Sequence, residues 1–211
     1  MILLIGSQKG GSGKSTLAVN ISALLAGKGF NVMLVDADRQ TTAANWAGDR
    51  EENLELSRVN CIQKYDNIRE TLNDLNKHYD YVIVDAAGRD SKELRTGMVA
   101  ADILLIPFKP SQPDLDTMPK MVELIGQAKD FNEALKVFGV ITMAPSNPLI
   151  NESNEAKEYL ANYPEINLLK TLIRDRKVYR DAMSSGSGVT ELKNPKAKAE
   201  VQLLVDEVMG W

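Results

Sequence analysis

The chain has 211 residues, a formal net charge of −4 at pH 7, and 44% hydrophobic and 26% charged residues. This composition is typical of a globular domain with a substantial core, and the net charge gives the protein as a whole no attraction to nucleic acid. No apolar run approaches the roughly 20 residues that a membrane helix needs, and the first residues lack the features of a secretion signal. The single cysteine, Cys61, excludes an internal disulfide, and we expect a cytoplasmic protein.

Short apolar runs alternate with helical patterns almost to the end of the chain. The runs predict strands at Ile2–Ile5, Asn31–Val35, Leu54–Val59, Tyr81–Val84, Ile103–Ile106, Val137–Ile141 and Leu168–Ile173. The helical patterns lie near residues 14–28, 41–50, 66–78, 91–100, 114–129, 151–162, 175–184 and 196–209. We therefore expect an α/β fold, with one domain over residues 1–211. Its sheet should be doubly wound and mostly parallel, with helices on both faces and the ligand at the carboxyl ends of the strands.

A glycine-rich segment, Gly6–Thr16, joins the first predicted strand to the first predicted helix. Backbone N–H groups in such a loop, together with the N-terminus of the helix, can bind a polyphosphate. The segment ends like a phosphate-loop signature, with Lys14 placed for the β- and γ-phosphates and Ser15 for Mg²⁺. The alternative is a glycine-rich surface turn that happens to contain lysines. The predicted nucleotide-binding residues of the segment are Lys9, Gly10, Gly11, Ser12, Gly13, Lys14, Ser15 and Thr16.

Gln8 stands where the usual phosphate-loop pattern has a glycine, and Lys9 adds a second lysine to the loop. The resulting K-G-G-x-G-K-S resembles the deviant phosphate loop of the ParA/MinD group of ATPases. This resemblance implies a P-loop, Rossmann-like fold, ATP and Mg²⁺ as cofactors, and an ATP-dependent homodimer. In that group the first lysine reaches across the dimer to the partner's nucleotide, so Lys9 and Lys14 are the expected catalytic lysines.

Two carboxylates follow the second predicted strand, in the segment Val35–Gln40. In a parallel sheet they lie at the ligand edge beside the phosphate loop, although a solvated strand end is the alternative. The segment resembles the D-x-D-P-Q motif of the ParA group, with Arg39 in place of the proline. The resemblance implies that Asp36 supports the Mg²⁺ shell, that Asp38 orients the attacking water, and that Gln40 belongs to the same switch.

The fourth predicted strand has the form of a Walker B segment, in which buried residues deliver Asp85 to the water shell of Mg²⁺. The following D-x-x-G resembles a switch II loop whose Gly88 N–H senses the γ-phosphate. Ser15, Asp36 and Asp85 are thus the expected metal residues. Further along, Thr142 and Met143 lie where related ATPases place contacts to the adenine edge. A methionine after a strand is, however, more often part of the core.

The segment from Lys170 to Lys198 carries a net charge of +5, which leaves −9 for the rest of the chain. Such asymmetry is typical of a basic surface on an acidic protein, and Lys and Arg side chains there would bind DNA phosphates without reading sequence. Small ParA proteins bind non-specific DNA through C-terminal basic residues after ATP dimerises them, although an ordinary basic surface is the alternative. The predicted DNA-binding residues are Arg174, Arg176, Lys177, Arg180, Lys193, Lys196 and Lys198.

The last predicted helix includes Glu200–Val208, which is acidic and has an apolar stripe suited to packing on the sheet. It does not resemble the basic amphipathic helix with which MinD-like ATPases bind membranes, so no membrane partner is expected.

The overall resemblance is to small plasmid-partition ParA proteins. It implies an ATPase for plasmid or chromosome segregation, associated with the nucleoid and stimulated by a ParB-like or other small centromere-binding protein. Two alternatives stay open. One is an ATPase of the same group that positions carboxysomes, chemoreceptor clusters or a division inhibitor. The other is a metabolic P-loop ligase resembling dethiobiotin synthetase.

Overall fold

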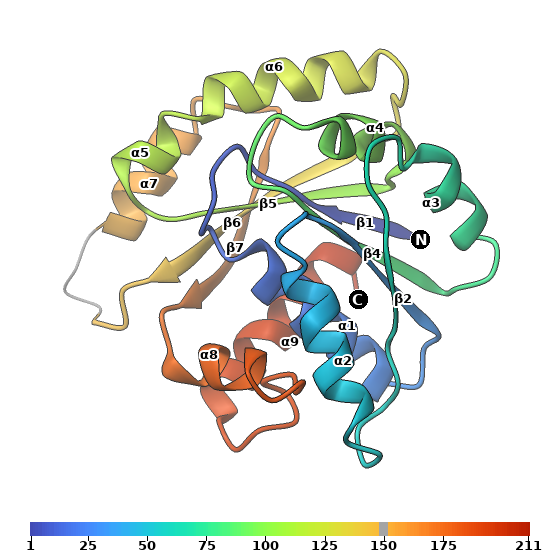
Figure 1. Cartoon of the computed structure of the whole chain (residues 1–211). Helices are drawn as coiled ribbons and strands as arrows, with labels where there is room; N and C mark the ends of the chain where they lie inside the picture. Colours follow the sequence, from blue (N-terminus) through green and yellow to red (C-terminus); the bar gives the residue numbers. More distant parts are fainter. Residues whose placement is uncertain (148–151) are drawn as a thin grey trace.

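A parallel sheet runs through the middle of the computed structural model, which describes residues 1–147 and 152–211 (Figure 1). The described strands are β1 (Ile2–Ile5), β2 (Val32–Ala37), β3 (Asn60–Gln63), β4 (Tyr81–Ala86), β5 (Ile103–Phe108), β6 (Lys136–Ala144) and β7 (Asn167–Arg174). They lie in the order β3-β2-β4-β1-β5-β6-β7, and each pair of neighbours is parallel. The predicted doubly wound α/β fold is confirmed.

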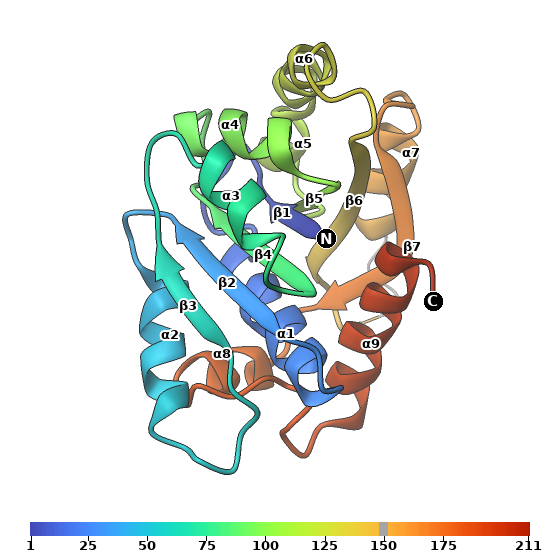
Figure 2. The same ribbon diagram turned by 90° about the vertical axis from the view of Figure 1, so that its right-hand side faces the viewer.

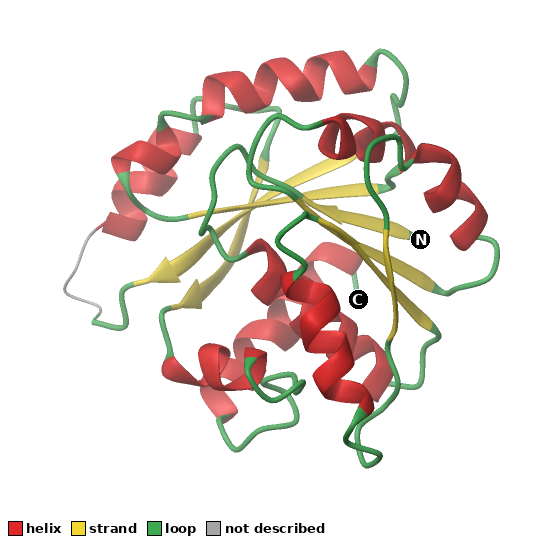
Figure 3. Ribbon diagram, in the orientation of Figure 1, coloured by secondary structure: helices red, strands yellow, loops and turns green. Residues whose placement is uncertain are grey.

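Helices cover both faces of the sheet, as the two perpendicular views and the colouring by secondary structure show (Figures 2 and 3). One layer contains α1 (Lys14–Gly27), α2 (Thr42–Glu51), α8 (Lys177–Met183) and α9 (Pro195–Met209). The other contains α3 (Arg69–Leu75), α4 (Lys92–Ala100), α5 (Gln112–Leu115), α6 (Met118–Lys129) and α7 (Glu152–Leu160). None of the described helices combines the length and apolar character of a membrane span.

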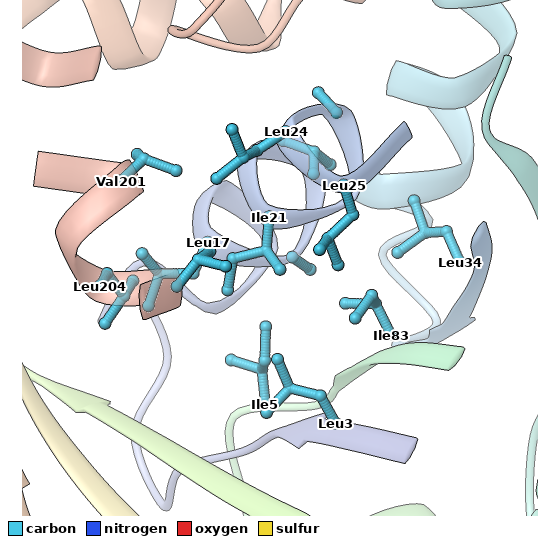
Figure 4. Close-up of a cluster of buried hydrophobic side chains, with 14 of the residues drawn as sticks. Leu3, Ile5, Leu17, Ile21, Leu24, Leu25, Leu34, Ile83, Val201 and Leu204 are labelled. Carbon is cyan, nitrogen blue, oxygen red and sulfur yellow. The ribbon is translucent and has the colours of Figure 1, made fainter. Parts of the chain in front are cut away.

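The two faces of the sheet form two hydrophobic cores, because successive side chains of a strand point to opposite faces. Leu3 and Ile5 of β1 point toward Leu17 and Ile21 of α1, as Figure 4 shows. Their neighbours Ile2 and Leu4 belong to the core on the opposite face. Burial on both faces explains why the central strands read as continuous apolar runs rather than as alternating patterns.

Two predicted elements are wrong. The run Leu54–Val59 is not a strand: the side chain of Leu54 is 96% exposed, and the strand that pairs with β2 is β3 (Asn60–Gln63). The helix predicted over residues 114–129 is divided into α5 and α6, each of which has a proline in its first turn. Proline fits the first turn of a helix but removes a hydrogen bond elsewhere, so Pro119 begins a new helix. The helix predicted near 151–162 is described from Glu152, and residue 151 lies outside the described residues.

A buried ion pair fastens the segment after α8 to the end of α2. The side chain of Arg50 is 2% exposed, and its guanidinium group donates hydrogen bonds to both carboxylate oxygens of Glu191, at 2.6 and 2.9 Å. It also donates to the backbone carbonyls of Ser57 and Gly186. Nearby, the indole N–H of Trp46 donates to the Ser187 carbonyl at 3.0 Å. Each of the three guanidinium nitrogens therefore has an acceptor, which offsets the cost of burying the charge.

Helix α9 has a buried leucine next to an exposed one, so substitutions of the two can show how much its buried face contributes to stability. Leu204 is fully buried against α1, whereas the adjacent Leu203 is 57% exposed. We expect Leu204→Ala to lower the free energy of unfolding by about 2–5 kcal/mol, because it leaves a cavity. Leu203→Ala should change it by less than about 0.5 kcal/mol. Urea unfolding followed by circular dichroism measures both, and equal effects would contradict this packing of α9.

Candidate nucleotide-binding site

The register of three central strands brings the predicted site residues to one edge of the sheet. Ile5 of β1 is paired with Asp85 of β4, and Asp85 is paired with Asp36 of β2. Neighbouring strands are about 4.8 Å apart, so the two carboxylates lie side by side where the loop after β1 begins. The predicted phosphate loop and both predicted metal carboxylates therefore share one edge.

The phosphate loop is held in its shape by two glycines and a set of hydroxyl groups. Gly11 and Gly13 have φ angles of 73° and 87°, in the left-handed region that favours glycine. The hydroxyl oxygens of Ser7 and Ser12 are 3.0 Å apart. The buried hydroxyl of Thr142 is 2.8 Å from the Ser12 carbonyl oxygen, so Thr142 supports the underside of the loop from β6.

Lys14 lies in the middle of the loop and is almost completely buried. Its ammonium group donates a hydrogen bond of 3.1 Å to the Lys9 carbonyl. Burial lowers the pKa of Lys14, and the negative charges of Asp85, Asp38 and Asp114 oppose this shift. A buried ammonium surrounded by backbone N–H groups is a site for a strongly anionic ligand, since such a ligand would compensate its charge.

Gly88 packs directly on the phosphate loop. A Cβ atom at this position would lie 2.7 Å from both Lys14 Nζ and the Lys9 carbonyl oxygen. Only a residue without a side chain fits between these groups. The predicted switch glycine is thus in contact with the phosphate loop.

The ammonium group of Lys9, the second lysine of the loop, contacts α5. It donates to the backbone carbonyl of Pro113, in α5, at 3.3 Å. This single neutral acceptor is the only partner of the ammonium among the described residues. The two oxygens of the neighbouring Asp114 carboxylate accept hydrogen bonds from the Lys109 N–H and the Ser111 hydroxyl instead.

Asp36 is fully buried, and both of its oxygens are already bound. They accept hydrogen bonds from the backbone N–H groups of Asp38, at 3.0 Å, and Ala44, at 2.8 Å. Burial raises the pKa of Asp36, and these hydrogen bonds oppose the rise. Asp36 therefore fixes the loop after β2 and the first turn of α2, and any role toward a metal would act through this support.

Asp85 differs from Asp36, because its oxygens are buried and neither makes a hydrogen bond within normal geometry to a described residue. Burial raises its pKa to about 7, an effect that the nearby Ser15 hydroxyl opposes. Native proteins rarely leave a buried carboxylate without partners. The Asp85 carboxylate and the nearby Ser15 hydroxyl are oxygen ligands of the kinds that Mg²⁺ prefers, so this pair fits that ion.

One open cavity is lined by most of the predicted phosphate-loop residues, by the three predicted switch residues and, of the predicted metal residues, by Ser15. Asp38 and Gln40 enter it from the loop after β2, and Gly88 and Arg89 from the loop after β4. The Asp38 carboxylate accepts a hydrogen bond from the Gln40 N–H at 3.0 Å. The remaining lining residues include Gly10, Gly11, Gly13, Lys14, Ser15, Thr16, Arg39, Thr42 and Met143.

Comparison with known proteins agrees with this geometry. The family model of the CobQ/CobB/MinD/ParA nucleotide-binding domain matches residues 3–189. The chain belongs to this family. Within it, the chain is a ParA/MinD-type ATPase, and its relatives include ParA of Rhizobium radiobacter, which is 25% identical over 92% of this chain and 86% of that protein.

A second relative is the maintenance of carboxysome distribution protein A of Halothiobacillus neapolitanus, 30% identical over 98% of this chain and 95% of its own length. Two solved structures share the fold. Apo McdA of Cyanothece has a TM-score of 0.80 at 20% identity, with 98% of each chain covered. MinD of Aquifex aeolicus has a TM-score of 0.76 at 20% identity and covers 100% of this chain and 97% of that chain.

In this ParA/MinD-type ATPase, a narrower slot lies beside the phosphate loop. It is lined by Gly13, Thr16 and Leu17 and by Thr142 and Met143, whose contact with adenine stays a prediction. The sequence patterns did not predict that the end of β7 and helix α8 line the same slot. Their lining residues are Ile173, Arg174, Asp175, Arg176, Tyr179, Arg180 and Met183. The missed signal is the end of β7, because Ile173 and Arg174 reach the same sheet edge as Asp36 and Asp85.

Four of the predicted DNA-binding residues form hydrogen bonds or ion pairs within the protein. Arg176 donates to the Glu200 carboxylate at 2.6 Å, and Arg174 donates to the Pro145 carbonyl at 2.6 Å. Arg180 pairs with Asp175 at 2.9 Å, and Lys177 pairs with Asp181 at 3.1 Å. By contrast, Lys193, Lys196 and Lys198 are exposed and pair with no carboxylate among the described residues. The DNA-binding role of all seven stays a prediction.

The raised pKa of Asp85 makes a pH-dependent prediction. The unfolded chain releases the Asp85 proton at about pH 4, whereas the native protein keeps it up to about pH 7. The free energy of unfolding therefore falls as the pH rises between these two values. Without Mg²⁺ and nucleotide, Asp85→Asn should gain stability relative to wild type between about pH 5 and pH 8, measured by urea unfolding. The exposed Asp130→Asn is the control. A difference that does not change with pH would contradict the assignment.

Proposed function

We propose that this chain is an ATPase that pairs with a second copy around two ATP molecules, binds non-specific DNA as a dimer and serves DNA partition. The observation that carries the proposal is the placement of Lys9. Lys9 belongs to the phosphate loop, but its ammonium group lies 3.3 Å from the Pro113 carbonyl oxygen of α5, which is its one partner among the described residues. A lysine that serves the nucleotide of a second copy needs an ammonium group that lies outside its own phosphate loop.

The residues of the cavity divide the work of binding and hydrolysis. Lys14 and the loop N–H groups bind the phosphates, while Ser15 and Asp85 hold Mg²⁺, with Asp36 fixing the loop beside them. Mg²⁺ there would neutralise charge on the β- and γ-phosphates. Asp38 orients the attacking water, and Gln40 and Gly88 respond to the γ-phosphate. Thr142 and Met143 approach the adenine. Phosphoryl transfer needs mainly such positioning and charge neutralisation.

The proposed DNA surface centres on the start of α9, where Lys196 and Lys198 follow the N-cap residue Asn194. Positive charges in the first turn oppose the helix dipole, so they do not serve the stability of this helix. Together with Lys193 they form an exposed basic group suited to DNA phosphates. Lys177 and Arg180 of α8 lie in the same helix layer and could extend it.

The same proposal names the partners and the place of action. A ParB-like or other small centromere-binding protein would stimulate hydrolysis and release the dimer from nucleoid DNA in the cytoplasm. A second candidate function is the positioning of a protein cargo of the carboxysome kind. It is favoured by the relative that is 30% identical over nearly the whole chain and is named for carboxysome distribution. The protein encoded by the neighbouring gene would distinguish the two cargoes.

Dimerisation is the first test. In the Asp38→Ala background, which should slow hydrolysis, Mg·ATP is expected to double the mass measured by light scattering, whereas ADP leaves a monomer. Adding Lys9→Ala should abolish this dimer, and adding Lys129→Ala, a lysine on α6 far from the loop, should not. If the ATP-loaded protein stays monomeric but still hydrolyses ATP, the paired mechanism is wrong and a metabolic P-loop enzyme becomes the better interpretation.

DNA binding is the second test. The ATP-loaded Asp38→Ala protein should bind random duplex DNA with an affinity that falls as salt rises. The double variant Lys196→Ala/Lys198→Ala should lower the slope of log K against log salt by about 0.9 for each lost phosphate contact. Lys129→Ala/Lys136→Ala is the matched control for charge. A dimer that binds no DNA in any nucleotide state would leave the ATPase proposal standing and remove the DNA role.

A further inference from the structure

Arg39 stands between two predicted switch residues, Asp38 and Gln40, and lines the same cavity as the phosphate loop. The motif that this segment resembles has a proline at this position, so the guanidinium group is a feature of this chain rather than of the motif. Its side chain is 63% exposed and does not contribute to the core. A long cationic side chain at the rim of a candidate polyphosphate site is within the region where it could contact the ligand.

Two residues of the loop between β3 and α3 hold this guanidinium in the structure. The ring of Tyr65 lies 4.9 Å from the guanidinium carbon, and the Asp66 carboxylate lies 3.9 Å from a guanidinium nitrogen. Asp66 is 69% exposed, and the distance is at the limit of an ion pair. Solvent-exposed contacts of these two kinds contribute little, because water screens them and both side chains must be held in one geometry. Arg39 is therefore held weakly and can be released at little cost.

The holding loop itself is firmly anchored, and its anchor lies next to switch II. Asp66 has a φ angle of 65°, and its N–H donates to the Glu93 carboxylate at 2.8 Å. Glu93 is buried in the first turn of α4, which begins four residues after Gly88. The Ile68 N–H donates to the Thr96 hydroxyl of the same helix at 3.2 Å. Helices α3 and α4 lie side by side in both ribbon views (Figures 1 and 2). The loop thus connects the two switch segments.

Charge decides where Arg39 moves when a triphosphate is present. A guanidinium group binds phosphate oxygens through two parallel hydrogen bonds, which are stronger than a single contact to an exposed carboxylate. A triphosphate adds several negative charges to the cavity that Arg39 already lines, whereas its present contacts are weak and open to solvent. A diphosphate lacks the outermost group and offers less charge near the switch.

We infer that Arg39 is a triphosphate-directed residue of this ATPase: Tyr65 and Asp66 hold it at the rim of the cavity, and the γ-phosphate of ATP draws it in. The inference rests on the proposed function, because it takes ATP as the ligand. It assigns to the loop between β3 and α3 the role of a holder that competes with ATP. When Arg39 leaves Tyr65 and Asp66, the loop after β2 loses its contact with the loop that is anchored on α4.

The experiment compares ATP with ADP, because a brace that only stabilises the loop would affect both nucleotides equally. Binding of Mg·ATP to the Asp38→Ala protein and of Mg·ADP to the same protein is measured by equilibrium dialysis. Adding Arg39→Ala should weaken ATP binding about tenfold or more and ADP binding less than about twofold. Arg39→Lys should recover only part of the loss, since it keeps the charge without the paired donors. Arg69→Ala, an exposed arginine on α3, is the control.

The holder variants give the opposite sign. Tyr65→Leu and Asp66→Asn remove the two contacts while leaving the backbone hydrogen bonds of the loop in place, so ATP binding should tighten by up to about fivefold. If they weaken ATP binding as Arg39→Ala does, Arg39 is a structural brace and the inference is overturned. An unchanged ratio of ATP to ADP affinity in Arg39→Ala also overturns it. Failure of the starting protein to bind ATP at all would instead remove the proposed function.

Discussion

The site depends on the parallel register of β1, β4 and β2. Parallel pairing aligns the carboxyl ends of the strands, so residues separated by about eighty positions in the chain meet at one edge. Because these strands are buried on both faces, a shift of one residue would exchange their two cores and carry Asp36 and Asp85 to the wrong faces. The hydrophobic pattern that fixes the fold thereby also fixes the place of the carboxylates.

The chemistry of the site rests on charges that burial has left incompletely compensated. Burial lowers the pKa of Lys14 and raises that of Asp85, so the charged form of each group is less stable than it would be in water. In the proposed function, a polyphosphate with Mg²⁺ would supply the missing partner of each. The free protein is therefore less stable than its fold would allow, and binding recovers what the empty arrangement gives up.

Local patterns predicted the parts of the site that one segment forms by itself. The phosphate loop and the positions of the acids after β2 and β4 follow from strand ends and glycine positions, whereas the contact of Gly88 with the loop is visible only in the structure. The slot lined by Gly13, Thr16 and the end of β7 was not predicted, because its two walls come from segments more than 150 residues apart. The strand predicted at Leu54–Val59 failed for a similar reason: its leucines look apolar, but nothing covers Leu54. Thr142 was expected near the adenine, and only the structure shows that its hydroxyl also supports the Ser12 carbonyl.

The buried pair of Arg50 and Glu191 has a mechanical consequence. Separating the two side chains would leave the Arg50 guanidinium buried without a compensating charge, which is strongly unfavourable. The end of α2 and the segment that follows α8 are consequently obliged to travel as one rigid piece. Because α8 lines the slot and α2 follows the Asp38 loop, a displacement of either helix is expected to displace the other.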